Sequence, residues 1–96
     1  MLQPKIISVE AISNHMLLLV YDTKEIKLFN VKPYIKGEWY SQLQDESYFK
    51  AVMTDGWIVE WPNGQDIAPE ELYEQSSNVS EDDLIAISAK HILKER

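Results

Sequence analysis

The sequence predicts a small α+β protein with an antiparallel sheet, built from a three-strand meander plus a hairpin, short helices and a C-terminal amphipathic helix. Three observations support this fold class. Strand-like apolar patterns recur within the first 30 residues, a turn sequence at Asp55-Gly56 joins two further strand-like segments, and apolar residues recur at helical spacing near the C-terminus. The chain has 96 residues, 45% of them apolar, which is enough for one domain with a single core.

The first two segments of the meander differ in how their apolar residues are arranged. Residues 5–12 alternate with period two, which predicts a half-buried strand whose core face carries Ile7, Val9 and Ala11. Residues 16–21 (MLLLVY) are apolar at every position, which is typical of a strand covered on both faces or central to a sheet. We therefore expect the second segment to be the better buried of the two.

The third strand is followed by a helical segment. Residues 25–30 alternate again, and we expect Ile26 and Leu28 to face inward. Between residues 39 and 52, apolar side chains recur at spacings that predict one or two short helical turns. Asp45 is expected to cap the second turn, because a carboxylate at that position accepts a hydrogen bond from a free backbone N–H.

The hairpin at Asp55-Gly56 is followed by a helix start. Its second strand should end at Trp61, because Pro62 has no N–H to donate to a ladder. Pro69 suits the first position of a helix, where the missing N–H costs nothing. The glutamates directly after Pro69 fall in the first turn, where the helix dipole favours carboxylates.

The polar stretch of residues 76–78 (SSN) is interpreted as a linker. It divides the chain into a compact α+β core domain, residues 1–75, and a linker with a C-terminal helix, residues 76–96. Ser80 predicts an N-cap, with Asp83 three residues later as in a capping box. We expect the apolar stripe of this helix to be an interface, made of Leu84, Ile85, Ala89, Ile92 and Leu93.

Composition excludes several classes of function. The chain contains no cysteine, so disulfides, thiolate nucleophiles and thiolate metal sites are ruled out. The net charge is −7, which opposes binding to nucleic acid or to an anionic membrane surface. No segment resembles a secretory signal or a membrane span. We therefore expect a cytoplasmic protein without a nucleic-acid or membrane partner.

Candidate catalytic and metal-binding residues are few. Asp66, Glu70 and Glu74 bring carboxylates to one helix start, and oxygen ligands of this kind bind Mg²⁺ or Ca²⁺, but their spacing matches no known loop signature. His15 and His91 lie in separate elements without an evident partner and are interpreted as surface residues. We expect no metal site, no cofactor and no enzymatic activity.

Aromatic side chains give a further candidate surface. They are Trp39, Tyr40, Trp57, Trp61 and Tyr73. Stacking on nucleic-acid bases also requires a basic groove, which this acidic chain lacks. We therefore expect these side chains in the core or in a protein–protein interface.

Two motifs carry a family resemblance. Residues 43–52 read LxDxxxFxxV, and residues 61–73 read WPNGxDIxPExLY. Together with the three strand-like segments before them, they resemble a bacterial family known as domain of unknown function 2442, over about residues 4–75. The second motif is the more specific, and residues 23–25 (TKE) depart from the family, whose members often have Asp-Gly or Asn-Gly there.

The resemblance implies a compact α+β fold of antiparallel strands with short helices, and it implies no activity. Some relatives carry a helix-turn-helix domain after the core, for which residues 76–96 have too little room. Other relatives are encoded beside a second small protein, as toxin–antitoxin pairs are.

Our functional hypothesis is a nonenzymatic protein-interaction module whose C-terminal stripe pairs with a second copy, as a homodimer, or with another protein. Whether that helix packs on its own domain or on a partner is left open by the sequence. One alternative is an antitoxin-like or regulatory adaptor that holds a basic partner through its acidic surface. The other is a carboxylate-metal hydrolase built on Asp66, Glu70 and Glu74.

Overall fold

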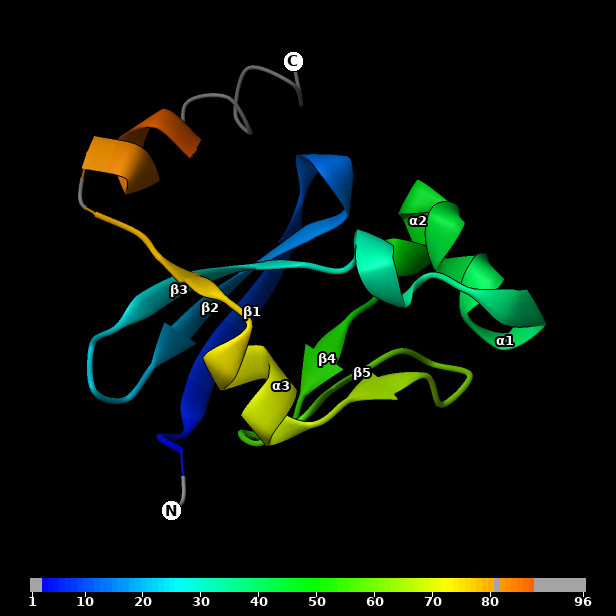
Figure 1. Ribbon diagram of the computed structural model, residues 1–96, viewed down its shortest axis with the longest axis horizontal. Coiled ribbons are helices and arrows are strands. Elements are labelled where there is room, and N and C mark those ends of the chain that lie inside the picture. The colour runs from blue at the N-terminus through cyan, green and yellow to red at the C-terminus, as the bar shows by residue number, and fades with distance from the viewer. Residues whose placement is uncertain (1–2, 81, 88–96) are drawn as a thin grey trace.

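The computed structural model describes residues 3–80 and 82–87 (Figure 1). One antiparallel sheet has the strand order β1-β2-β3-β7. Its strands are β1 (Ile6–Ile12), β2 (Met16–Tyr21), β3 (Ile26–Asn30) and β7 (Ser77–Asn78). The predicted α+β class and the predicted three-strand meander are confirmed, and β2 is the central strand of the meander.

The rest of the chain between β3 and β7 forms a second, smaller sheet and short helices. The sheet has the order β4-β5-β6, with β4 (Met53–Thr54), β5 (Val59–Glu60) and β6 (Asp66–Ile67). The α-helices are α1 (Gly37–Ser41), α2 (Glu46–Phe49) and α3 (Pro69–Glu74). Short 3-10 turns cover Ser13–His15, Lys32–Tyr34 and Gln42–Gln44.

Two of the helices begin as the sequence predicts. The carboxylate of Asp45 accepts a hydrogen bond of 2.9 Å from the backbone N–H of Ser47, so it caps α2. Pro69 occupies the first turn of α3, followed by Glu70 and Glu71. The first turn of a helix has backbone N–H groups without a partner inside the helix. Asp45 accepts from one of them, and Pro69 has no N–H at that position.

The core lies between the inner face of the four-stranded sheet and the elements between β3 and β7. The sheet contributes Leu17, Leu19, Tyr21 and Phe29, and the elements between β3 and β7 contribute Leu43, Phe49, Val59, Trp61, Ile67 and Leu72. The indole N–H of Trp61 donates to the carbonyl of Phe49 at 2.9 Å, and the two rings stack with centroids 5.7 Å apart. This contact connects the residue after β5 to the end of α2.

The face predicted for β1 is wrong at its start. Ile7 is 62% exposed, whereas Ile6 is buried in the core. The register between β1 and β2 shifts between Ile6 and Ser8, so one extra residue enters β1 there. An inserted residue of this kind reverses the side-chain alternation on one side of it, and Ala11 farther along the strand is still buried.

The face predicted for β3 is reversed. Lys27 and Phe29 are buried, whereas Ile26 and Leu28 lie on the opposite face and are partly exposed. The lysine is tolerated because its ammonium group donates to the carbonyl of Tyr73 at 3.2 Å and lies 4.4 Å from the centre of the Tyr73 ring. Lysine stems can cover apolar surface while the charged end finds a polar or aromatic partner.

Two short strands fall where the sequence predicts other structure. After Trp61, residues 62–64 form a turn, and the chain then folds back as β6. The N–H of Trp61 donates to the carbonyl of Gln65 at 2.9 Å. Residues 77–78, expected in the polar linker, form β7 and pair with Lys27 and Leu28 of β3. Both strands are two residues long, too short to show any apolar periodicity.

The described part of the C-terminal segment lies on the outer face of the four-stranded sheet. In Figure 1 the helical turn of residues 82–87 (orange) is on the other side of β1, β2 and β3 from α1, α2 and β5. Val79 connects it to the sheet, because its N–H donates to the carbonyl of Ile26 at 2.9 Å. The helix start therefore lies over part of the outer face, where Met16 and Leu28 remain partly exposed.

Candidate functional site

The helix of residues 82–87 begins at the predicted cap. The hydroxyl of Ser80 accepts a hydrogen bond of 3.1 Å from the N–H of Asp83, and the N–H of Leu84 donates to the carbonyl of Ser80 at 2.9 Å. These two bonds satisfy donors that the first turn of a helix cannot use internally. The end of β7 and the cap together fix where this helix leaves the sheet.

The predicted interface residues have different environments. Leu84 is half-buried, whereas Ile85 is 67% exposed. Ala89, Ile92 and Leu93 lie outside the described residues. In the described turn, the predicted stripe therefore divides between a side that packs on this chain and a side that faces solvent.

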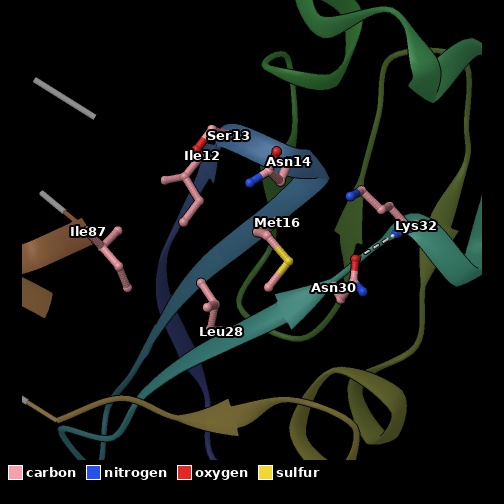
Figure 2. Close-up of a pocket in the computed structure, with 8 residues that line it drawn as sticks. All are labelled: Ile12, Ser13, Asn14, Met16, Leu28, Asn30, Lys32 and Ile87. Atoms are coloured by element: carbon pink, nitrogen blue, oxygen red, sulfur yellow. Dashed lines mark hydrogen bonds between the residues drawn. The ribbon is translucent and has the colours of Figure 1, made fainter. Parts of the chain in front are cut away.

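A pocket of ≈ 310 Å³ lies between this helix and the outer face of the sheet. Figure 2 shows Ile12, Met16 and Leu28, from the three adjacent strands β1, β2 and β3, on the same side of the sheet as Ile87 of the helix. The strand register brings them together, because Ile12 pairs with Met16 and the next outer residue of β2, Leu18, pairs with Leu28. We call this the outer-face pocket.

Polar residues form the far edge of the outer-face pocket. They are Ser13, Asn14, Asn30 and Lys32 (Figure 2). The amide oxygen of Asn30 accepts a hydrogen bond of 3.1 Å from the backbone N–H of Lys32, which orders the chain as it leaves β3. Asn14 turns the chain between β1 and β2 with φ of 65°, a conformation that asparagine tolerates better than most residues.

None of the strand and turn residues of this pocket is predicted as a site residue from the sequence. The available signal is that residues 16–21 are apolar on both faces, which requires something to cover the outer face. Which residues of β1 and β3 join them depends on strand register. Sequence periodicity alone does not give that register, particularly beside the extra residue in β1.

Charges of opposite sign are exposed at the polar edge of the pocket and on the helix that carries Ile87. Lys32 is exposed at the polar edge, and Asp82 and Asp83 are exposed in the first turn of the helix. Carboxylates in a first helical turn are favoured by the helix dipole. The acidic helix start and the Lys32 edge are complementary surfaces.

The titratable groups with shifted pKa values include Tyr21 and Glu25, which do not line the outer-face pocket. Burial raises the pKa of Tyr21 to about 12. Hydrogen bonds from Thr23 and Tyr73 lower the pKa of Glu25 below its usual value. Both shifts move the groups farther from neutral pH, so this cluster does not hold a proton donor or acceptor tuned to neutrality.

The carboxylates considered for a metal site do not come together. Within residues 3–80 and 82–87, no group of three or more histidine, aspartate or glutamate side chains is arranged to hold a metal ion, Asp66, Glu70 and Glu74 included. The hydrolase alternative therefore has no assembled site in this part of the chain.

The aromatic residues separate into core and surface positions. Trp61 is 1% exposed, whereas Trp39 and Trp57 are 54% and 43% exposed. The interpretation of His15 as a surface residue is wrong, because its ring packs against the edge of Phe49 with centroids 5.0 Å apart and its Nε2 atom is buried. His91 lies outside the described residues.

Comparison with known proteins identifies the family. The sequence matches the family described as "Protein of unknown function (DUF2442)" over residues 6–78. The chain belongs to this family. The matched region of this DUF2442 protein runs from the start of β1 to the end of β7, so it contains both sheets and ends before the Ser80 cap. The resemblance inferred from the two sequence motifs is confirmed.

No curated protein and no solved structure gave a match to the chain. In the described part of this DUF2442 protein, no helix has the length and apolar character needed to cross a membrane.

Proposed function

We propose that this DUF2442 protein is a nonenzymatic interaction module that pairs with a second copy of itself through the helix beginning at Ser80. The observation that carries the proposal is the environment of Ile85. It is a large apolar side chain, 67% exposed, on a helix whose Ile87 lines the outer-face pocket. The predicted interface also includes Leu84, Ala89, Ile92 and Leu93.

In this proposal, the two sides of the helix have different roles. Leu84 and Ile87 are half-buried and hold the helix start on its own sheet, whereas Ile85 contacts the partner copy. A two-fold pair brings the acidic first turn of one copy to the Lys32 edge of the other, and the reverse contact forms at the same time. Opposite charges in these positions fix the orientation of the pair.

A matched pair of isoleucine variants tests the contact. Ile85→Glu places a charge in the proposed interface and should convert a dimer to folded monomers. Ile7→Glu is the control, because Ile7 is 62% exposed on β1 and is not part of the outer-face pocket. Sedimentation velocity measures the mass, and circular dichroism checks the fold. A wild-type monomer, or equal loss of dimer in both variants, would contradict the proposal.

Charge exchange tests the orientation in the same assay. Lys32→Glu and Asp82→Lys should each weaken the dimer, and the double variant should recover most of the lost affinity because the attraction is restored with its sign reversed. Additive losses in the double variant would rule out contact between these two residues while leaving the Ile85 contact to be judged on its own.

A second candidate function, the adaptor for a basic partner, is supported by the net charge of −7. Binding of that kind weakens with salt, because attraction between exposed charges is screened over about 10 Å at 0.1 M salt. Partner capture at low and at physiological salt tests it. Retention that is unchanged by salt would count against the adaptor.

A further inference from the structure

A second surface surrounds Trp39 in α1. The indole ring lies over the turn at Gly64, where a methyl group in place of the α-hydrogen would be 3.5 Å from ring atom Cζ2. The ring is nevertheless 54% exposed. With Glu38, Gln42 and Asn63, it lines an open pocket of ≈ 400 Å³, which we call the Trp39 shelf.

A chain of hydrogen bonds beneath the Trp39 shelf fixes the direction of its amide groups. Fully buried Gln65 donates from Nε2 to the backbone carbonyl of Trp39 and to Oε1 of Gln42, both at 2.7 Å. Its Oε1 atom accepts from the hydroxyl of Tyr48 at 2.6 Å. That hydroxyl in turn accepts from the backbone N–H of Asn63 at 2.8 Å.

Both ends of this series of hydrogen bonds are backbone groups, which fix the direction of every bond between them. A backbone N–H only donates and a backbone carbonyl only accepts, so the Tyr48 proton must go to Gln65 and the Gln65 amide cannot be reversed. Gln42 must therefore present its oxygen to Gln65. The same oxygen accepts from Nδ2 of Asn63 at 2.9 Å.

Two polar groups are left over at the surface. The Nε2 group of Gln42 can still donate, and Oδ1 of Asn63 can still accept, because neither has a partner among the described residues. Both side chains are exposed. The Trp39 shelf thus offers a hydrogen-bond donor and a hydrogen-bond acceptor of fixed direction beside a flat aromatic surface.

This arrangement fits a peptide segment better than other ligands. One residue of an extended segment presents its carbonyl and its N–H on the same side, so the carbonyl can accept from Gln42 while the N–H donates to Asn63. The exposed indole and the carboxylate of Glu38 suit a guanidinium group, which stacks on aromatic rings and pairs with carboxylates. The net charge of −7 favours a cationic ligand and opposes nucleotides and other anions.

We propose that the Trp39 shelf binds an extended peptide segment that carries an arginine. Gln42 and Asn63 bind the carbonyl and the N–H of one residue of the segment, and the arginine side chain lies on Trp39 near Glu38. This surface is separate from the helix that begins at Ser80, so the proposal does not depend on dimer formation.

Nuclear magnetic resonance titration with a defined probe tests the shelf. The probe is acetyl-Ala-Arg-Ala-amide, added at millimolar concentration to the full-length protein. Shifts are expected at the indole N–H of Trp39 and at the side-chain amides of Gln42 and Asn63. Trp39→Ala should lower the affinity about tenfold or more, as removal of an aromatic anchor does. Trp57→Ala is the control, because Trp57 is 43% exposed and is not on the shelf.

A second variant separates peptide recognition from simple attraction of a cation. Gln42→Glu keeps an acceptor for Gln65 and Asn63, but it replaces the free donor of the shelf with an acceptor. If the shelf recognises the backbone of the peptide, this variant should bind the probe more weakly despite its added negative charge. Tighter binding would instead show that only the charge of arginine is sensed, which would overturn the proposal.

Three other results would overturn it as well. The first is the absence of shifts at the three reporter groups throughout the titration. The second is a set of shifts that persists unchanged in Trp39→Ala. The third is a stronger response to methyl glucoside, a neutral ligand with neighbouring hydroxyl groups, than to the peptide. The mass of the protein in each variant shows whether the dimer is affected, so the two proposals can fail separately.

Discussion

The buried hydroxyl of Tyr21 destabilises the folded protein. Tyr21 is 1% exposed, and its oxygen is buried without a hydrogen-bond partner in the described part of the chain. Its ring packs edge-on against Tyr73 with centroids 5.2 Å apart. Leaving a buried hydroxyl unpaired costs about 1 to 3 kcal/mol, whereas the ring itself stabilises the core.

We therefore expect Tyr21→Phe to leave the free energy of unfolding at neutral pH unchanged or to raise it by about 1 kcal/mol. The ring contact with Tyr73 is retained, and only the unpaired oxygen is removed. Urea unfolding followed by tryptophan fluorescence measures the change. A loss of stability of about 1 kcal/mol or more would mean that the hydroxyl is hydrogen-bonded after all.

The same residue makes the free energy of unfolding depend on pH in the alkaline range. Burial raises the pKa of Tyr21 from 10.0 to about 12, so the folded state holds the proton longer than the unfolded state. Its contribution is fully present below pH 10 and is lost as the pH rises toward 12, by up to about 3 kcal/mol. Tyr34 adds to the same loss, because its hydrogen bond to Glu71 raises its pKa to about 12.

Tyr21→Phe should therefore flatten, without abolishing, the fall in unfolding free energy between pH 10 and pH 12. Tyr34→Phe is the comparison, since its hydroxyl is at the surface and solvent screens part of its effect. The measurement is urea unfolding at a series of pH values. Identical pH profiles for wild type and Tyr21→Phe would show that Tyr21 does not carry the effect.

At the scale of elements, the sequence predicts what is decided locally. The Asp45 and Ser80 caps, the Pro69 helix start and the three strands of the meander depend on residues within a few positions of one another. The faces of β1 and β3 depend on pairing with other strands, so an extra residue near Ile7 and a buried Lys27 reversed them.

The candidate site divides in the same way. The helix start follows from a local cap, which the sequence predicts, whereas the sequence leaves open which residues of the apolar stripe pack on the sheet and which, such as Ile85, are exposed. The outer-face pocket depends on three strands in register, and the Trp39 shelf joins α1 to a turn more than 20 residues later. Neither arrangement leaves a periodic signal in the sequence.

The Ser80 cap provides a prediction at this scale. Ser80→Ala removes the acceptor for the N–H of Asp83 and should destabilise the helix start by about 1 kcal/mol. Ser80→Asp is the control, because aspartate caps helices as well as serine does. Hydrogen exchange at the Asp83 amide should accelerate about fivefold or more in the alanine variant alone. Equal protection in all three proteins would mean that the helix is held by packing and not by its cap.

At the scale of the whole molecule, the core and the described part of the C-terminal segment lie on opposite faces of the four-stranded sheet. Among residues 3–80 and 82–87, the buried core residues lie between Ile6 and Leu72, and the family match ends at residue 78. The outer face is nevertheless apolar: Leu18 is only 9% exposed and pairs with Leu28, which lines the outer-face pocket beside Ile87. The described helix start, residues 82–87, therefore contributes no residue to the core, whereas it lies over part of the outer face.

Ending the chain after Asn78 tests this division. The pairing of β7 with β3 is kept, but the bond from Val79 to Ile26 and the helix start are lost. We expect the shortened protein to fold, because it keeps every core residue of the described part of the chain. We also expect it to bind a hydrophobic dye and aggregate more than the full chain, because a sheet face loses part of its cover. In the shortened chain, Leu18→Thr should reduce both effects, since threonine suits a strand and is less apolar. If near-ultraviolet circular dichroism instead showed loss of tertiary structure, the segment after residue 78 would be part of the folding unit, and the predicted boundary after residue 75 would be wrong.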